Sequence, residues 1–288
     1  MQVDFAVRAS RAVLRHPWQG AQRVGARLDA RRDRRELAGL AASRSDLYRV
    51  SDDWPRRLHQ AIGVEWPCAE TAAFAEAWDA TVSDLTSAGL RTGLASYRGW
   101  NDGDKGECQA IWCFVAHMRP TTVVETGVAH GVTTRLILQG LERNGHGGLW
   151  SVDLPAVDPA LHPEIGIAVP RESRVRWTYV EGTSRDRLPR LVDDLGQIDL
   201  FVHDSLHTGR NVCFELDTVW PALRPGGVAV VDDIERSLGF RKFSDRTEPH
   251  EWFGARHVTG QGLWGVAVRA RGHVLAAEDR RVDGRQRC

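Results

Sequence analysis

Between about residues 104 and 270, short β-rich segments alternate with helical ones, and this alternation limits the fold more than any other feature of the sequence. The β-rich segments fall at 121–125, 149–153, 175–180, 198–203 and 228–231, and the helical patterns at 104–118, 133–143, 188–195 and 211–223. This order of elements predicts a parallel sheet with helices on both faces. Two last strands, 252–258 and 263–269, flank Thr-Gly-Gln-Gly, which predicts a hairpin that closes the sheet with an antiparallel strand.

Composition excludes several classes of protein. The chain has 288 residues, 42% of them hydrophobic and 26% charged, as in ordinary globular proteins. No apolar run is long enough to span a membrane, and arginines interrupt any signal-peptide core near the N-terminus. The net charge of zero argues against a nucleic-acid partner. Five cysteines without a C-x-x-C pair predict reduced thiols in a cytoplasmic protein, with neither a zinc site nor a disulfide framework.

The regions outside this alternating core suggest a division into three parts. Residues 1–95 are expected to form an N-terminal helical cap, residues 96–270 the catalytic domain, and residues 271–288 a polar tail. Within the cap, residues 1–43 carry nine arginines and read as a helix with a basic face. One expectation is that this helix packs on the rest of the chain or on a second subunit. The alternative is that it binds an anionic membrane surface or an acidic partner. A homodimer is therefore one expectation.

The first strand runs into a glycine-containing loop, Glu125-Thr126-Gly127-Val128-Ala129-His130-Gly131. Gly127 and Gly131, with the small Ala129 between them, let the backbone turn tightly and approach a ligand at the start of the next helix. Asp153 ends the second strand, where an acid accepts hydrogen bonds from ribose hydroxyls. The loop and the acid together predict a nucleoside ligand. Glu125 suits a ligand with positive charge, such as an aminoacyl group with a sulfonium, better than a pyrophosphate.

Three acids end two strands that this topology makes neighbours. Asp204 follows the fourth strand, and Asp232 and Asp233 follow the fifth. Crowded carboxylates at one sheet edge are costly without a cation, and an oxygen-only cluster suits magnesium. The alternative is that these acids cap the segments that follow them. His207, near the start of the next helical segment, is placed to deprotonate a substrate hydroxyl, with Asp204 as the competing base, whereas His203 alternates into the core.

A loop before the core contains the groups that grip a polyol or a sugar. Tyr97, Trp100 and Asp102 combine aromatic rings with a carboxylate and are expected to contact substrate. The equally weighted alternative is an Asp/Gly helix cap with packed aromatic side chains.

Four of these segments carry a family resemblance: E-T-G-V-A-H-G, S-V-D-L-P, I-D-L-F-V-H-D-S-L-H and L-R-P-G-G-V-A-V-V-D-D-I. They resemble class I S-adenosylmethionine-dependent methyltransferases, and more narrowly the metal-dependent sugar O-methyltransferases of antibiotic pathways (macrocin type) and the cephalosporin-hydroxylase-like relatives. The resemblance implies a Rossmann-like α/β sheet of seven strands with the last one antiparallel. The resemblance also implies which residues contact each part of the cofactor. The methionine end would contact Glu125, Gly127, Ala129 and Gly131, the ribose Asp153, the adenine Thr183 and Ser184, and the reactive end Asp204. Magnesium would be bound by Asp204, Asp232 and Asp233.

The predicted function is a magnesium-assisted O-methyltransferase that uses S-adenosylmethionine and acts on a hydroxyl of a small, polar, sugar-like or natural-product substrate. Two alternatives stay open, a metal-independent methyltransferase with His207 as base, and a non-catalytic cofactor-binding partner subunit. A nicotinamide-dependent oxidoreductase is disfavoured because it needs a third glycine and would place Glu125 beside a pyrophosphate.

Overall fold

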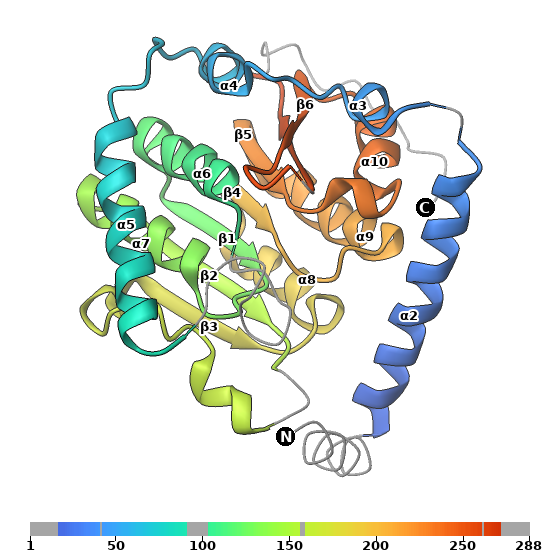
Figure 1. Ribbon diagram of the computed structural model, residues 1–288, viewed down its shortest axis with the longest axis horizontal. Helices are drawn as coiled ribbons and strands as arrows, with labels where there is room; N and C mark the ends of the chain where they lie inside the picture. Colours follow the sequence, from blue (N-terminus) through green and yellow to red (C-terminus); the bar gives the residue numbers. More distant parts are fainter. Residues whose placement is uncertain (1–16, 41, 91–102, 156–158, 261, 272–288) are drawn as a thin grey trace.

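The computed structural model describes residues 17–40, 42–90, 103–155, 159–260 and 262–271, and these contain one seven-stranded sheet in the order β3-β2-β1-β4-β5-β7-β6 (Figure 1). Its strands are β1 (Thr122–Thr126), β2 (Gly148–Asp153), β3 (Trp177–Glu181), β4 (Ile198–His203), β5 (Leu223–Val231), β6 (Glu251–Arg256) and β7 (Leu263–Val268). Only β7 runs antiparallel to its two neighbours, so the predicted fold class is confirmed.

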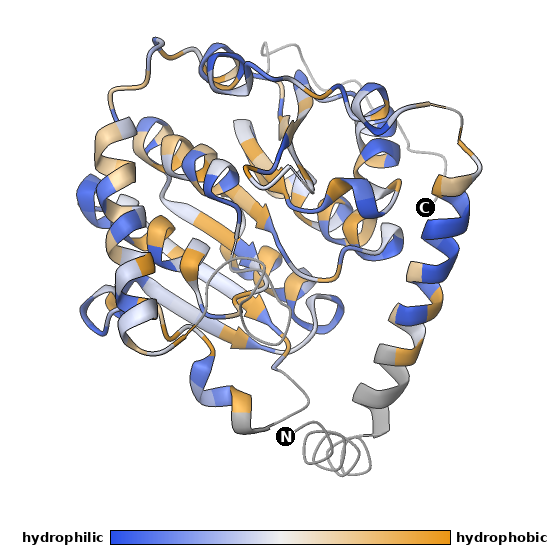
Figure 2. Cartoon of the chain, in the orientation of Figure 1, coloured by the Kyte–Doolittle hydropathy of each residue, from blue (hydrophilic) through white to orange (hydrophobic). Residues whose placement is uncertain are grey.

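Helices cover both faces of this sheet. They are α6 (Lys105–Met118) and α7 (Val132–Asn144) on one face, and α8 (Ser184–Leu195), α9 (Gly209–Val219) and α10 (Gly239–Thr247) on the other. Alternate residues of a strand therefore enter two separate cores; Leu200 packs with α6 and α7, whereas Phe201 packs with α8, α9 and α10. The apolar colouring of Figure 2 is concentrated in these central layers.

Three local expectations were wrong. The sequence Pro225-Gly226-Gly227 was expected to be a turn before the fifth strand, but it lies inside β5, where the register with β4 shifts. Helix α9 ends at Val219 and a short 3-10 helix (Trp220–Ala222) replaces its expected last turn. Helix α10 was not predicted, although its buried Phe240 and Phe243 are spaced three residues apart as in an amphipathic helix.

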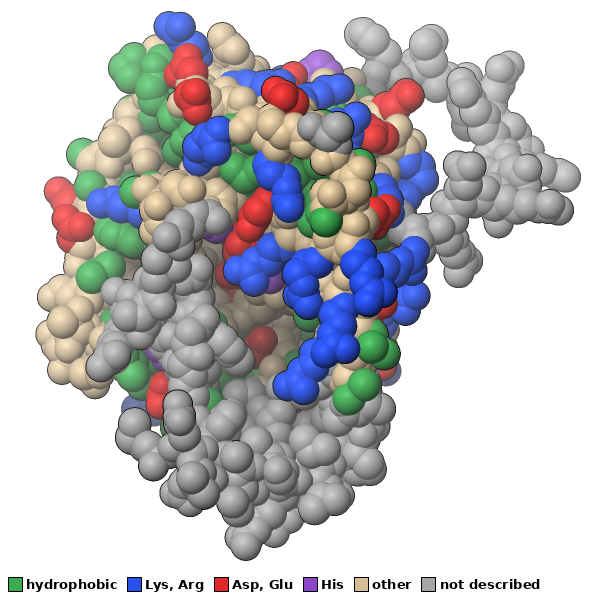
Figure 3. Space-filling view, turned by 45° about the vertical axis from the view of Figure 1, so that its right-hand side comes forward, with side chains coloured by type: hydrophobic (Ala, Val, Ile, Leu, Met, Phe, Trp, Pro, Cys, Tyr) green, Lys and Arg blue, Asp and Glu red, His purple; other side chains and the backbone are tan. Residues whose placement is uncertain are grey.

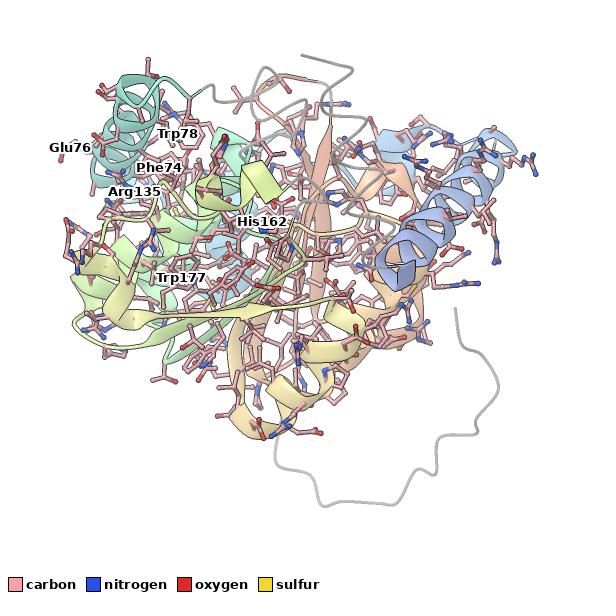
Figure 4. The ribbon with its side chains drawn as sticks, turned by 90° about the horizontal axis from the view of Figure 1, so that it is seen from below. Phe74, Glu76, Trp78, Arg135, His162 and Trp177 are labelled. Atoms are coloured by element: carbon pink, nitrogen blue, oxygen red, sulfur yellow. The ribbon has the colours of Figure 1, made fainter. Side chains whose placement is uncertain are left out.

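The N-terminal helices lie at separate places around the sheet. Helix α4 (Trp54–Ile62) packs on α6 and β6, and α5 (Thr71–Ser87) packs on α6 and α7; α3 (Arg44–Leu47) is a single short turn. In the α5 contact, the Phe74 ring lies 6.2 Å from the ring of Trp112, and Arg135 of α7 forms a 2.7 Å ion pair with Asp84 (Figure 4). Helix α4 therefore extends the core on the α6 and α7 face, and α5 forms a further apolar cluster with α6 and α7.

Helix α2 (Pro17–Ala38) attaches to the body mainly through acidic side chains. Buried Asp33 accepts a hydrogen bond from the first backbone N–H of α9, at Gly209, and Glu36 pairs with Lys242 at 2.7 Å. An acid suits this place because the N-terminus of a helix is electropositive. The arginines of α2 between residues 27 and 35 are exposed on the outer surface, where basic side chains gather (Figure 3). No helix in the described ranges has the length and apolar character needed to cross a membrane.

Candidate active site

The glycine loop between β1 and α7 follows the shape predicted for it. Gly127 and Gly131 have φ values of 89° and 84°, in the left-handed region that favours glycine, and Ala129 also has a positive φ of 46°. A Cβ on Gly127 would lie 1.9 Å from the backbone oxygen of Asp204. Gly127 is therefore required for the loop to pass directly beside the end of β4, which joins the predicted cofactor loop to the predicted acidic edge.

Gly131 has a different neighbour from the one expected. A Cβ there would lie 2.9 Å from the Cα of Gly166, so this glycine accommodates another chain segment as well as the start of α7. That segment is tied to the loop by two backbone hydrogen bonds, from Gly166 to Ala129 and from Ala168 to His130. The chain after β2 therefore packs on the glycine loop and supports it.

Glu125 is buried at the end of β1. Its Oε2 accepts hydrogen bonds from Ser151 (2.6 Å) and Thr134 (2.8 Å). Burial raises the pKa of Glu125 to about 7, against the opposing effect of these two hydroxyls. Near neutral pH this side chain therefore exists in both protonation states.

A pH dependence of cofactor binding follows if Glu125 faces the cofactor's ammonium group. Affinity for S-adenosylhomocysteine should rise about twentyfold from pH 6 to pH 8. A factor of about ten comes from ionisation of Glu125 through its pKa of about 7. Asp153, whose burial raises its pKa to about 6, should contribute a further factor of about two. Isothermal calorimetry on wild type and Glu125→Gln checks this, because the variant should keep only the factor of about two. An unchanged twentyfold rise in Glu125→Gln would remove Glu125 from the cofactor site.

Asp153 ends β2, directly opposite Glu181 of β3 in the sheet register. Its carboxylate accepts a hydrogen bond from the backbone N–H of Val128 in the glycine loop and adjoins the Tyr179 side chain. The acid therefore lies against the loop that it was predicted to accompany.

Asp153→Ala should weaken binding of S-adenosylhomocysteine at least tenfold. Each charged hydrogen bond to the ribose contributes about 1.5–3 kcal/mol, and the variant loses two of them. Calorimetry measures the affinity, and circular dichroism confirms that the variant is folded. The exposed acid Asp193 on α8 offers a matched control, since Asp193→Ala should bind like wild type. Equal affinities for the two variants would remove Asp153 from the ribose site.

The two predicted adenine contacts have local structural partners. The Thr183 hydroxyl accepts a hydrogen bond from the backbone N–H of Asp186 and so caps α8. The Ser184 hydroxyl lies 3.4 Å from the amide oxygen of Asn211. Their role toward adenine stays a prediction.

The acids at the carboxyl edge separate into two groups. Asp204 and Asp232 follow adjacent parallel strands, and together with His207 they place one ligand atom each within 4.8 Å of one another. Asp233 is not a member of this group; its φ of 51° turns the chain, and its carboxylate forms a 2.7 Å ion pair with Arg236. The structure therefore brings together two of the three predicted metal ligands, and Asp233 keeps only a 3.6 Å contact with His207.

Two further residues join this edge that the sequence had not indicated. Glu107, in the first turn of α6, and His257, just after β6, form a second group with Asp232 whose ligand atoms lie within 4.8 Å. His257 Nε2 is 2.8 Å from Asp232 Oδ1, whereas Glu107 Oε1 is buried without a hydrogen-bond partner in the described ranges. Burial, followed by the charges of Asp232 and Asp204, raises the pKa of Glu107. Burial, followed by the charges of Asp232 and Asp233, raises the pKa of Asp204. We call Glu107, Asp204, His207, Asp232 and His257 the acidic site.

His207 lies in the loop between β4 and α9, and the expected helical start is absent there. Its Nε2 is 3.7 Å from Asp204 Oδ1. Burial lowers the pKa of His207 to about 4, so the imidazole is neutral at pH 7 and has a free lone pair for a proton.

His203, expected to be a core residue, is fully buried and this is confirmed. Its Nδ1 is 2.6 Å from Glu215 Oε2, and Glu215 also accepts hydrogen bonds from Thr126, Ser205 and Asn211. This network fixes the ends of β1 and β4 against α9. The Asp/Gly cap is confirmed at Asp104, which caps α6. The predicted substrate residues Tyr97, Trp100 and Asp102 lie outside the described residues.

The sheet order, the glycine loop and the acid after β2 define the fold of class I S-adenosylmethionine-dependent methyltransferases. Residues 124–234 match the family model described as "Methyltransferase domain". A curated relative from Streptomyces olivaceus, 8-demethyl-8-alpha-L-rhamnosyl tetracenomycin-C 2'-O-methyltransferase, is 31% identical over 126 residues. That match covers 41% of this chain and 30% of the relative, so the chain spans less than a third of that protein's length.

Two solved structures share the fold. The O-methyltransferase from Bacillus cereus in complex with S-adenosylhomocysteine has a TM-score of 0.51 and 15% identity, covering 76% of this chain and 99% of its own. The O-methyltransferase TomG from Streptomyces achromogenes, in complex with S-adenosylmethionine, has a TM-score of 0.50 and 14% identity, covering 68% of this chain and 90% of its own. At these identities the likeness shows the fold alone.

Proposed function

We propose that this chain transfers the methyl group of S-adenosylmethionine to a hydroxyl of a small, polar, sugar-like or natural-product molecule. The observation that carries the proposal is the direct contact between the glycine loop, at Gly127, and the end of β4, at Asp204. This contact puts a cofactor bound at the loop beside the acidic site. A relative that methylates a sugar-bearing natural product, as its name states, supports this acceptor class.

The residues of the acidic site fit a divalent cation. Carboxylates dominate the site. Buried Glu107 Oε1 has no hydrogen-bond partner among the residues that the structure describes, and a cation would satisfy this oxygen. Asp204, Asp232 and Glu107 would hold magnesium, which prefers oxygen ligands. Asp233, paired with Arg236, supplies charge nearby. When bound, the ion would lower the pKa of a coordinated hydroxyl.

Two side chains of the site are placed to accept the proton that the substrate hydroxyl loses. Methyl transfer forms a carbon–oxygen bond, breaks the carbon–sulfur bond, and releases the hydroxyl proton. His207 is neutral and 3.7 Å from Asp204, so either group is placed to accept that proton. The neutral state of His207 is also the observation that favours the second candidate, a metal-independent methyltransferase with His207 as base.

Incubating the enzyme with S-adenosylmethionine, magnesium and a panel of hydroxylated glycosides and polyols tests the function. The expected result is a product heavier by one methylene, together with S-adenosylhomocysteine in equal amount. Tight binding of the cofactor without turnover on any acceptor would favour the partner-subunit alternative. The domain boundaries, the cytoplasmic location and the homodimer stay predictions.

A further inference from the structure

Two histidines and two cysteines meet where α4 packs on α6. His59 comes from α4, Cys68 from the segment after it, and Cys113 and His117 lie one turn apart on α6. Cys68 Sγ is 3.3 Å from both Cys113 Sγ and His117 Nε2. One ligand atom each from His59, Cys68 and His117 lies within 4.8 Å of the others. Three groups that bind soft metals therefore share one small volume, and Cys113 adjoins this volume through its contact with Cys68.

His59 is oriented as a metal-binding histidine would be. Its Nδ1 lies 2.6 Å from the backbone oxygen of Pro55, and since a carbonyl oxygen only accepts, Nδ1 carries the proton. The Nε2 lone pair is then exposed to the cluster, and this atom is buried without a hydrogen-bond partner in the described part of the chain. Zinc-binding histidines typically donate their second ring nitrogen to a carbonyl or carboxylate in this way.

The cluster is a polar group inside an apolar core. Cys68 and Cys113 are buried in a core that includes Leu58 and Phe114. Polar side chains in such surroundings are costly unless they find partners, and a soft metal ion would supply one partner to several of them at once.

We infer that His59, Cys68, Cys113 and His117 bind one zinc ion. Zinc–sulfur bonds of about 2.3 Å and zinc–nitrogen bonds of about 2.0–2.1 Å put neighbouring ligands of a tetrahedral site roughly 3.3–3.8 Å apart. Two sulfur ligands of such a site lie about 3.8 Å apart and a sulfur and a nitrogen about 3.5 Å apart, so the two 3.3 Å separations around Cys68 would have to widen by about 0.2–0.5 Å to hold the ion. Thiolate and imidazole ligands select zinc over magnesium, and four protein ligands leave no open position for a substrate. The ion is therefore structural.

This zinc site is separate from the acidic site but shares a helix with it. Glu107 lies in the first turn of α6 and His117 in the last, ten residues later, which corresponds to about 15 Å along the helix axis. Zinc would cross-link α6 to α4 and to the segment that carries Cys68. The helix that presents Glu107 would thus be fixed at its opposite end.

Elemental analysis of the untagged protein, purified under reducing conditions, tests this inference. We expect about one zinc per chain, falling at least tenfold in Cys68→Ala and in His117→Ala. Cys213→Ala is the matched control, because Cys213 is also buried but lies on α9 next to Gly239, and its zinc content should equal that of wild type. Asp232→Asn should likewise keep its zinc, which separates this site from the acidic site.

Cobalt gives a readout that does not depend on how well the variants fold. Metal-free wild type titrated with Co²⁺ should develop a sulfur-to-cobalt charge-transfer band and the strong visible bands of tetrahedral cobalt at one equivalent, and added zinc should remove them. Folded wild type that takes up neither zinc nor cobalt would overturn the inference. If mass spectrometry finds a Cys68–Cys113 disulfide in protein purified without reductant, and the same protein binds no zinc after reduction, a redox role would replace the inference.

Discussion

Asp204→Asn and Asp232→Asn are each expected to lower kcat about 10²–10⁴-fold while S-adenosylhomocysteine still binds within about threefold of wild type. A metal ion that stabilises a developing alkoxide contributes several kcal/mol, and each 1.36 kcal/mol changes the rate tenfold. Chelation of wild type with excess EDTA should reproduce the variants. Cofactor binding should survive because Glu125 and Asp153 end other strands. Initial rates, measured with and without magnesium, and calorimetry supply the two readouts.

Asp233→Asn is the matched control for these variants. Its carboxylate is engaged with Arg236, and asparagine tolerates the positive φ of this position well, so the change removes charge without straining the backbone. We expect the smallest loss of activity of the three changes. Full activity of the chelated enzyme would contradict the metal role and indicate that His207 accepts the proton of the substrate hydroxyl. In that case the rate of His207→Ala should be about 10²–10⁴-fold lower than that of wild type.

The central part of the acidic site could be predicted from the sequence because one topological rule suffices. Parallel strands end at the same edge of a sheet, and the strands that carry Asp204 and Asp232 are adjacent. The same reasoning could not separate Asp232 from Asp233. That distinction depends on a single left-handed residue, which turns the second carboxylate toward Arg236.

Glu107 and His257 could not be predicted in the same way. They lie 150 residues apart in the chain, and each is brought to the edge by an element other than the strands that carry the aspartates. A glutamate in the first turn of a helix is common because it favours the helix dipole, so Glu107 gave no distinct signal. His257 follows β6, which runs in the same direction as β4 and β5 and therefore ends at the same edge. The expected strand 252–258 placed His257 inside the strand rather than after its end at Arg256, and so hid this signal.

The N-terminal region shows a second limit of sequence patterns. An apolar stripe is the usual evidence that a helix packs on a core, but α2 docks through Asp33 and Glu36. Likewise, the four ligands of the proposed zinc site come from three segments and contain no C-x-x-C pair, so the expectation of no zinc site followed from spacing alone. The i, i+4 pair Cys113 and His117 is the one local signal of that cluster.

The largest loss of stability is expected from Glu215→Ala. The Glu215 carboxylate is fully buried and is contacted by His203, Thr126, Ser205 and Asn211. Removing it leaves these buried polar groups without their acceptor, and breaking a buried pair in this way costs about 3–5 kcal/mol. Chemical denaturation followed by circular dichroism measures the free energy of unfolding. The exposed Glu142 on α7 offers the control, since Glu142→Ala should change it by at most about 0.5 kcal/mol.

The Glu215 carboxylate also makes the free energy of unfolding of wild type depend on pH in acid. Burial opposes ionisation of Glu215, but His203 and the surrounding hydroxyls outweigh it and lower its pKa from 4.5 to about 2. A carboxyl whose pKa is lowered in the folded state stabilises the fold above the unfolded value, and this stabilisation is lost as the pH falls from about 4.5 toward 2. The loss attributable to Glu215 should be about 3 kcal/mol. In Glu215→Gln the free energy of unfolding should therefore depend less on pH over this range, and a slope equal to that of wild type would show that the network does not hold a charged carboxylate.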